Sequence, residues 1–234
     1  MVASNHISSA FDKDLKEMSG KITELAELVQ KQITAATQSL GALEDRGLDK
    51  LIKRDQKIDR LESEIIEQAV AVIALRAPRA EDLRNVLVMQ KVATILERMG
   101  DYARNTANRT KVVLAEGANL IPVSKVENMS SLLLKMLAKA LEAYHTSNRD
   151  LAVEVRNGDV EIDKIHTELH KEIVDAMAKN PDGLVSGVHL LFIIKNFERI
   201  GDYTAGIAEQ VYFLTEGEFI DDFRPKADKT SWNA

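Results

Sequence analysis

One charged phrase occurs twice in this chain. The stretch "LERMGDYARN" occupies residues 96–105 and "FERIGDYTAG" occupies residues 197–206, so a shared Glu-Arg-x-Gly-Asp-Tyr core recurs after 101 residues. Upstream, "RDQKID" at 54–59 and "GDVEID" at 158–163 repeat in the same order, with Asp55 and Asp159 separated by 104 residues (159 − 55). Similar displacements in two separate segments predict two copies of one structural unit of about a hundred residues.

The apolar pattern around these phrases is helical. Apolar residues recur at steps of three and four in six long blocks, which is the spacing of amphipathic helices. The blocks cover about residues 15–40, 48–75, 80–115, 124–144, 150–179 and 184–215. Glycine and proline are scarce, 11 and 4 residues, and several of them fall between the blocks, while Ser124 is placed to cap the fourth. This pattern predicts an all-α fold of two tandem homologous three-helix bundles related by a pseudo-two-fold internal repeat.

The repeat also divides the chain. We expect residues 1–120 to form the first three-helix repeat, residues 121–223 the second, and residues 224–234 a C-terminal tail. The connection between second and third helices is "RAPRAED" in the first copy and "NPDG" in the second. A difference in length at that connection accounts for the change in displacement from 104 to 101 residues, because connecting loops tolerate insertions.

Composition excludes several classes of protein. The formal net charge of −6 and pI of about 5.5 argue against nucleic acid as a partner, since phosphate backbones require a basic face. Cysteine is absent, which excludes disulfides, thiolate metal sites and cysteine nucleophiles. The N-terminus lacks a secretory pattern, and the longest apolar runs, "AVAVIAL" and "LLFII", are too short to span a bilayer. We therefore expect a cytoplasmic protein.

Paired carboxylates mark the second and third predicted helix of each copy. Residues four apart lie on one helix face, and like charges at that spacing destabilise a helix by roughly 0.2–0.5 kcal/mol per pair unless a cation neutralises them. Such pairs also occur by chance on solvated surfaces, but these four correspond under the repeat. Carboxylates favour hard or borderline cations such as Mg, Mn or Fe, so the pattern indicates an ion site. The four pairs are Asp55/Asp59, Glu97/Asp101, Asp159/Asp163 and Glu198/Asp202.

Three further residues extend these faces. Asn105 follows Asp101 by one turn and can offer an amide oxygen, whereas the equivalent residue of the second copy is Gly206. His166 and His170 continue the face of Asp159 and can serve either as metal ligands or as solvent-facing side chains. The two copies are therefore not expected to be equivalent.

The doubled motifs resemble the PhoU family of phosphate-uptake regulators. The likeness rests on "RDQKID", "LERMGDYARN", "GDVEID" and "FERIGDYTAG" in that order, and it extends over residues 6–223. It implies a cytoplasmic, non-enzymatic regulator that restrains the phosphate-starvation response. It further implies two partners, the ATPase subunit of a phosphate ABC transporter and a sensor histidine kinase, together with a homodimeric state and membrane association only through those partners.

The resemblance also implies a bound divalent or trivalent metal, Fe, Zn, Mg or Mn. Carried over by motif, the metal ligands would be Asp55, Asp59, Glu97, Asp101 and Asn105 in the first copy and Asp159, Asp163, Glu198 and Asp202 in the second. Gly206 departs from the asparagine of the motif.

Two other classes of protein compete with this interpretation. One is a di-metal carboxylate enzyme, although the helices carrying the repeated acids contain no Glu-x-x-His. The other is a general helical scaffold whose acids have no metal role.

Overall fold

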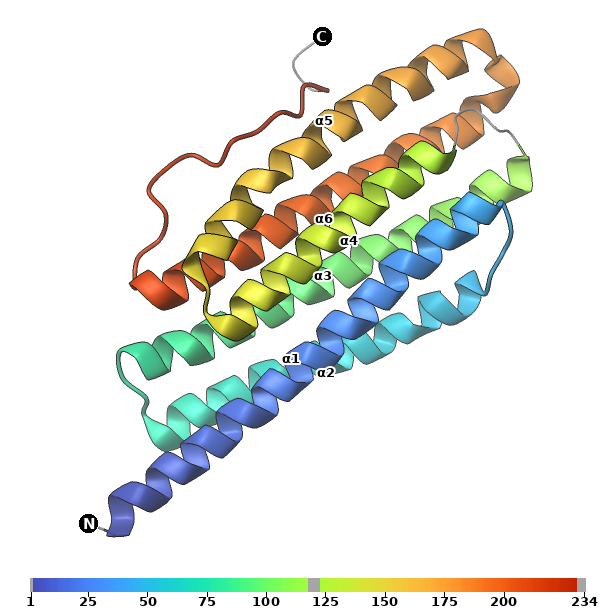
Figure 1. Cartoon of the computed structure of the whole chain (residues 1–234). Coiled ribbons are helices and arrows are strands. Elements are labelled where there is room, and N and C mark those ends of the chain that lie inside the picture. The colour runs from blue at the N-terminus through green and yellow to red at the C-terminus, as the bar shows by residue number, and fades with distance from the viewer. Residues whose placement is uncertain (1, 118–122, 231–234) are drawn as a thin grey trace.

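Six long α-helices make up most of the structure, a computed structural model that describes the backbone of residues 2–117 and 123–230 and the side chains of residues 10–117 and 124–230. The described residues contain no strand. The all-α prediction and the six helical blocks are therefore confirmed (Figure 1). The helices are α1 (Val2–Ala42), α2 (Leu48–Arg76), α3 (Glu81–Glu116), α4 (Val123–Thr146), α5 (Arg149–Lys179) and α6 (Leu184–Glu216), with a 3-10 turn, η1 (Pro181–Gly183), before α6.

The helices end where the sequence offers stop signals. Gly117 and Gly217 adopt left-handed backbone conformations after α3 and α6, and each donates its N–H to the carbonyl four residues earlier. Asn148 caps α5, because its side chain accepts a hydrogen bond from the Leu151 N–H at 3.0 Å. Ser124 was expected as the cap of α4 but lies inside that helix, which begins one residue earlier at Val123.

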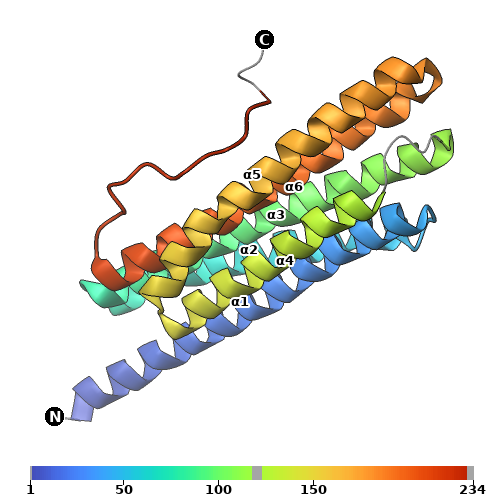
Figure 2. The same cartoon turned by 45° about the horizontal axis from the view of Figure 1, so that its top comes forward.

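The two copies pack into one body with a continuous core. Helices α1–α3 form one three-helix unit and α4–α6 the other, and α3 lies along α6 at the centre (Figures 1 and 2). A single hydrophobic cluster includes Ile58 and Met99 from the first unit and Phe197 and Ile200 from the second. The two homologous bundles are thus confirmed as the fold class, while the exact limits 1–120, 121–223 and 224–234 stay predictions.

The repeated phrases themselves meet at the contact between α3 and α6. The rings of Tyr102 and Tyr203 are 5.8 Å apart, and the guanidinium of Arg199 lies 5.4 Å from the centre of the Tyr102 ring. Arg98 is more than half exposed and lies 3.7 Å from Glu97 of its own helix. The tyrosines therefore serve packing between the two units.

The repeated glycines allow close helix approach. A Cβ added at Gly100 would lie 3.0 Å from the Ile58 Cδ1 atom, so α2 packs directly against the backbone of α3. A Cβ added at Gly201 would lie 2.9 Å from the Asp159 Oδ1 atom on α5. Glycine inside a helix is unfavourable by about 1 kcal/mol relative to alanine, and its presence here is explained by these contacts.

After α6 the chain reverses direction. Residues 217–230 run back in an extended conformation over α5 and α6 (Figure 2). The side chain of Arg156 on α5 holds the start of this return, because its Nη2 donates to the carbonyl of Asp222 at 2.5 Å. None of the helices within the described ranges is both long and apolar enough to cross a membrane.

Candidate functional site: two carboxylate rows

The repeat places two sets of acids at equivalent positions. We call them the first carboxylate row, between α2 and α3, and the second carboxylate row, between α5 and α6. Each row takes two carboxylates from each of its two helices, one turn apart. The first row consists of Asp55, Asp59, Glu97 and Asp101, and the second of Asp159, Asp163, Glu198 and Asp202.

The first row is neutralised by an arginine of its own helix pair. Arg104 on α3 forms an ion pair with the buried carboxylate of Asp55 and a second one with Asp101, whose Oδ1 lies 2.7 Å from the Arg104 Nη2. The Oδ1 atom of Asp55 has no hydrogen-bond partner among the described residues. Asp59 is exposed and Glu97 and Asp101 are half-buried, so this row faces solvent along one side.

Burial and mutual repulsion raise the pKa values of two acids of the first row. Burial raises the pKa of Glu97, and the charge of Asp101 raises it further. Burial likewise raises the pKa of Asp101, with Asp59 adding to the effect. A cation placed among these groups would relieve the repulsion.

The second row lies deeper in the protein. Asp159 and Asp163 are fully buried and Glu198 is 4% exposed. The first-row equivalents of Asp163 and Glu198 are more open, because Asp59 is exposed and Glu97 is half-buried. Burial raises the pKa of Asp159 to about 6, although the nearby cations of Lys226 and Arg224 oppose the shift. The Oδ1 atoms of Asp159 and Asp163 have no hydrogen-bond partner within the described part of the chain.

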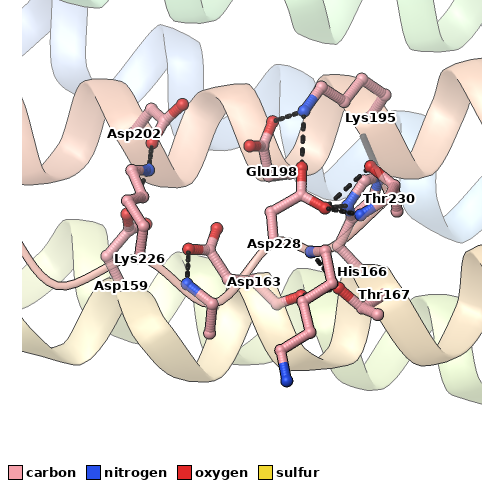
Figure 3. A network of polar contacts seen from close by, with 12 residues as sticks. Asp159, Asp163, His166, Thr167, Lys195, Glu198, Asp202, Lys226, Asp228 and Thr230 are labelled. Atoms are coloured by element: carbon pink, nitrogen blue, oxygen red, sulfur yellow. Dashed lines mark hydrogen bonds and ion pairs between the residues drawn. The ribbon is translucent and has the colours of Figure 1, made fainter. Parts of the chain in front are cut away.

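The cations that neutralise the second row come from the returning C-terminal segment (Figure 3). Lys226 forms ion pairs with Asp202 and with Asp159, at 3.1 Å for the latter. Arg224 pairs with Asp202 at 2.5 Å and also donates to the Asp202 carbonyl at 3.0 Å. The backbone N–H of Ala227 donates to the Asp163 Oδ2 at 2.8 Å. The second row is therefore covered by residues that follow it by more than twenty positions in the sequence.

A lysine on α6 forms two further ion pairs at the far end of the second row. Lys195 on α6 lies 2.9 Å from Glu198 and 3.0 Å from Asp228 of the returning segment. Burial would raise the pKa of Asp228, but hydrogen bonds from Thr230 and Lys195 hold it well below its usual range. Asp228 stays ionised and links the segment to α6.

The two predicted histidines differ in their surroundings. His166 is buried, with its Nδ1 3.3 Å from the Asp228 Oδ1, so the solvent-facing alternative is wrong for this residue. Burial lowers the pKa of His166 against the opposing influence of Asp228, which leaves the imidazole neutral at pH 7. His170 is half-buried one turn further along, with its ring centre 6.3 Å from that of His166.

The expected asymmetry at Asn105 and Gly206 is present but concerns an exposed position. Asn105 is exposed on α3, and a Cβ at Gly206 would contact only the Ile95 side chain, at 3.7 Å. The neighbouring position differs more in charge, because Arg104 of the first copy corresponds to Ala205 of the second. The returning segment had no predicted role, although Arg224 and Lys226 are two basic residues of an acidic chain at a spacing that places them on one side of an extended strand.

The rows have the donor chemistry of a cation site but not its finished geometry. Carboxylate oxygens suit Mg, Mn or Fe, and buried oxygens without partners remain at Asp55, Asp159 and Asp163. Across residues 10–117 and 124–230, however, no three acidic or histidine side chains converge as ligands of one metal ion. Basic side chains hold the central positions instead.

The match to known proteins follows the two copies. The family model described as "PhoU domain" matches residues 22–110 and again residues 126–211, and so includes every acid of both rows. The chain belongs to the PhoU family. The matched ranges of the PhoU domain end before residues 222–230, which cover the second row.

Relatives extend along nearly the whole chain. The Phosphate-specific transport system accessory protein PhoU homolog of Rhizobium meliloti is 35% identical over 97% of this chain and 95% of its own length. The protein of the same name from Zymomonas mobilis is 34% identical over 91% of this chain and 90% of its own. The crystal structure of PhoU from Pseudomonas aeruginosa has a TM-score of 0.85 at 29% identity, covering 89% of this chain and 100% of that one. The phosphate transport system regulatory protein PhoU from Streptococcus pneumoniae gives a TM-score of 0.83 at 29% identity, over 91% and 100%.

Proposed function

We propose that this protein is an accessory regulator of phosphate transport. It restrains the phosphate-starvation response by linking the ATPase subunit of a phosphate ABC transporter to a sensor histidine kinase. The observation that carries the proposal is the presence of two PhoU domains in this chain, together with relatives along nearly its whole length that are named for the phosphate-specific transport system. The protein acts in the cytoplasm as a homodimer and reaches the membrane through its partners.

A docking function, rather than catalysis, agrees with the chemistry of the rows. Arg104 and Lys226 neutralise acids at the centre of each row, in ion pairs within the folded protein that leave those acids with a counter-charge already in place. One Glu-x-x-His does occur, Glu142 and His145 near the end of α4, but both side chains are exposed. A di-metal site of the bundle type needs such groups on interior faces. We therefore propose a non-enzymatic protein.

The functional test uses cells that lack this protein. A reporter of the phosphate-starvation response should be active at high phosphate in these cells and silent again when the wild-type chain is restored. The tagged chain should recover the transporter ATPase subunit and the sensor kinase from the same cells. A reporter that stays silent at high phosphate without the chain would contradict the proposed role.

We further propose that the first carboxylate row binds a divalent cation of the Mg or Mn class. Its acids face solvent along one side, and the pKa values of Glu97 and Asp101 are raised by burial first and then by repulsion from neighbouring acids, which a cation would relieve. Binding would compete with Arg104 for Asp101, and a cation that prefers one packing of α2 against α3 shifts the population toward that packing.

Direct titration tests the cation proposal separately from signalling. Chelator-treated protein is titrated with Mn²⁺ and binding is followed by electron paramagnetic resonance. Asp59→Asn with Asp101→Asn should abolish binding to this row. The matched control is Asp150→Asn with Glu154→Gln, an acid pair of the same spacing with no acidic counterpart in the first copy, which should bind as the wild type does. Equal Mn²⁺ binding by both double variants would refute the site.

A further inference from the structure

The returning segment, residues 222–230, lies as an extended peptide against α5 and α6. We call the surface that these two helices offer it the groove, and its contacting side chains are Arg156, Asp159, Asp163, Thr167, Lys195 and Asp202. Three contacts of the segment use its main chain: the carbonyl of Asp222 accepts from Arg156, the N–H of Ala227 donates to Asp163, and the N–H of Lys229 donates to the Thr167 hydroxyl at 3.2 Å. Main-chain contacts of this kind do not depend on the side chains of the bound segment. They are the means by which proteins hold extended peptides of many sequences.

Side chains then give the groove its selectivity. Arg224 and Lys226 are two residues apart, so they lie on the same side of an extended segment, and both reach acids of the second row. Asp228, two residues further, meets the opposite charge of Lys195. The groove thus presents acid, acid and base in the order that complements an Arg-x-Lys-x-Asp sequence.

The acids of the groove require a cationic occupant. Asp159 and Asp163 are fully buried, and Asp159 is fixed against the backbone of Gly201. A buried carboxylate that loses its counter-charge is strongly unfavourable. In the first copy the counter-charge is built into α3 as Arg104, but in the second copy Ala205 stands at that position. Lys195 of α6 pairs with Glu198, but the cation that bridges Asp159 and Asp202 comes from a segment outside the helices.

The returning segment can leave without disturbing the core. The buried apolar residues of the main core lie between Phe11 and Val211, and the described tail contributes none of them. Arg224 and Lys226 bind at the surface of the groove, where their side chains remain 18% and 40% exposed. The side chains that contact the segment belong to α5 and α6, two helices anchored in the main core by their own buried apolar residues.

We propose that the groove over the second carboxylate row is a binding site for an extended basic segment of a partner protein, and that residues 222–230 are its built-in competitor. The partner segment carries two basic residues spaced by one and an acid two residues later. When it binds, it replaces Arg224, Lys226 and Asp228 by equivalent groups and displaces the tail. This inference rests neither on cation binding nor on the role in phosphate signalling.

A peptide titration of the full chain tests the proposal. The probe is a fluorescent peptide with the sequence of residues 219–230, FIDDFRPKADKT, followed by fluorescence anisotropy. In the wild type the attached tail competes at an effective concentration on the order of millimolar, so the probe binds weakly. Arg224→Glu with Lys226→Glu repels the tail from the acids, and this variant should bind the probe at least about tenfold more tightly. Arg224→Ser with Lys226→Ser should behave alike, and circular dichroism checks that both variants keep their helices.

Three controls place the site. Lys229→Glu reverses one charge at an exposed side chain of the same tail, where the released variant reverses two, and it should leave probe affinity at the wild-type level. Within the released variant, Asp159→Asn should abolish probe binding, whereas Asp55→Asn, the equivalent change in the first row, should not. A probe with serine in place of its arginine and lysine should not bind.

Two outcomes would overturn the proposal. The first is a released variant that binds the probe no more tightly than the wild type does. The second is a change of oligomeric state on release of the tail, seen by light scattering, because the natural occupant would then be the tail of a second copy rather than a partner segment.

Discussion

Lys226 takes in the second half of the molecule the role that Arg104 takes in the first. Arg104 bridges Asp55 and Asp101, and Lys226 bridges the equivalent pair, Asp159 and Asp202. The first cation belongs to α3, while the second arrives on an extended segment after the last helix. One repeated acidic motif is therefore neutralised from within a helix in one copy and by a segment outside the helices in the other.

Removing the cation of the first row should destabilise the fold. Arg104→Ala leaves the buried Asp55 carboxylate without its ion-pair partner, and we expect a loss of about 1–3 kcal/mol in the free energy of unfolding, measured with urea. Arg98→Ala is the control, because Arg98 is mostly exposed and, among the described residues, forms an ion pair with Glu97 alone. That change should stay within about 0.5 kcal/mol of the wild type. Equal losses in the two variants would show that the ion pairs of Arg104 contribute no more to the free energy of unfolding than the contact of the exposed Arg98 does.

Removing the cation of the second row should loosen the tail and spare the helices. Lys226→Ser should raise amide hydrogen exchange at Ala227 and Lys229 by about tenfold, because the ion pairs that hold these donors in place are lost. Lys229→Ser alters an exposed side chain of the same segment and should leave exchange at Ala227 unchanged. Unchanged exchange in Lys226→Ser would mean that the tail is held by other contacts.

The glycine against Asp159 should not tolerate a methyl group. In Gly201→Ala the new Cβ meets the Asp159 Oδ1 at 2.9 Å, so the carboxylate must move and we expect a loss of about 1–3 kcal/mol in stability. Gly158→Ala is the matched control inside α5, where a Cβ has no neighbour within 4 Å. There alanine should stabilise the helix by about 0.5–1 kcal/mol. Thermal and urea unfolding report both changes, and stabilisation in Gly201→Ala would contradict the close approach.

Asp159 should impose a pH dependence on stability. Its pKa is raised to about 6 in the folded protein, so between its ordinary value near 3.8 and 6 the folded state binds the proton more tightly than the unfolded state does. The stabilisation from this group is complete below about pH 3.8 and is lost as the pH rises through 6. By about 1.4 kcal/mol per pKa unit, the loss reaches roughly 3 kcal/mol.

Asp159→Asn removes this dependence. The stability of the variant relative to the wild type should therefore increase from pH 4 to pH 7 and then level off, as followed by urea unfolding at each pH. Asp175→Asn, which removes an exposed carboxylate from the same helix, controls for the change in net charge. A stability difference that is flat with pH, or that falls, would contradict the burial of an ionised Asp159.

The helices and the acid pairs could be predicted because both follow from local periodicity. Apolar steps of three and four define α1–α6, and the four-residue spacing puts each acid pair on one face. Contacts of the extended tail have no such period, since they depend on where α6 ends and on the direction of the chain beyond it. The repeat does contain one signal for the tail: next to the pair Asn105 and Gly206, the change from Arg104 to Ala205 removes the arginine that bridges the acids in the first copy.

The position of Lys226 can be measured by zero-length cross-linking. Carbodiimide joins an amine to a carboxylate in direct contact, and mass spectrometry identifies the joined peptides. Mixing unlabelled and nitrogen-15 protein separates links within one chain from links between two. We expect Lys226 to be linked to Asp202 or Asp159 of its own chain. A Lys226 that forms no such link, or forms it only between two chains, would contradict the assignment of the tail to the second carboxylate row.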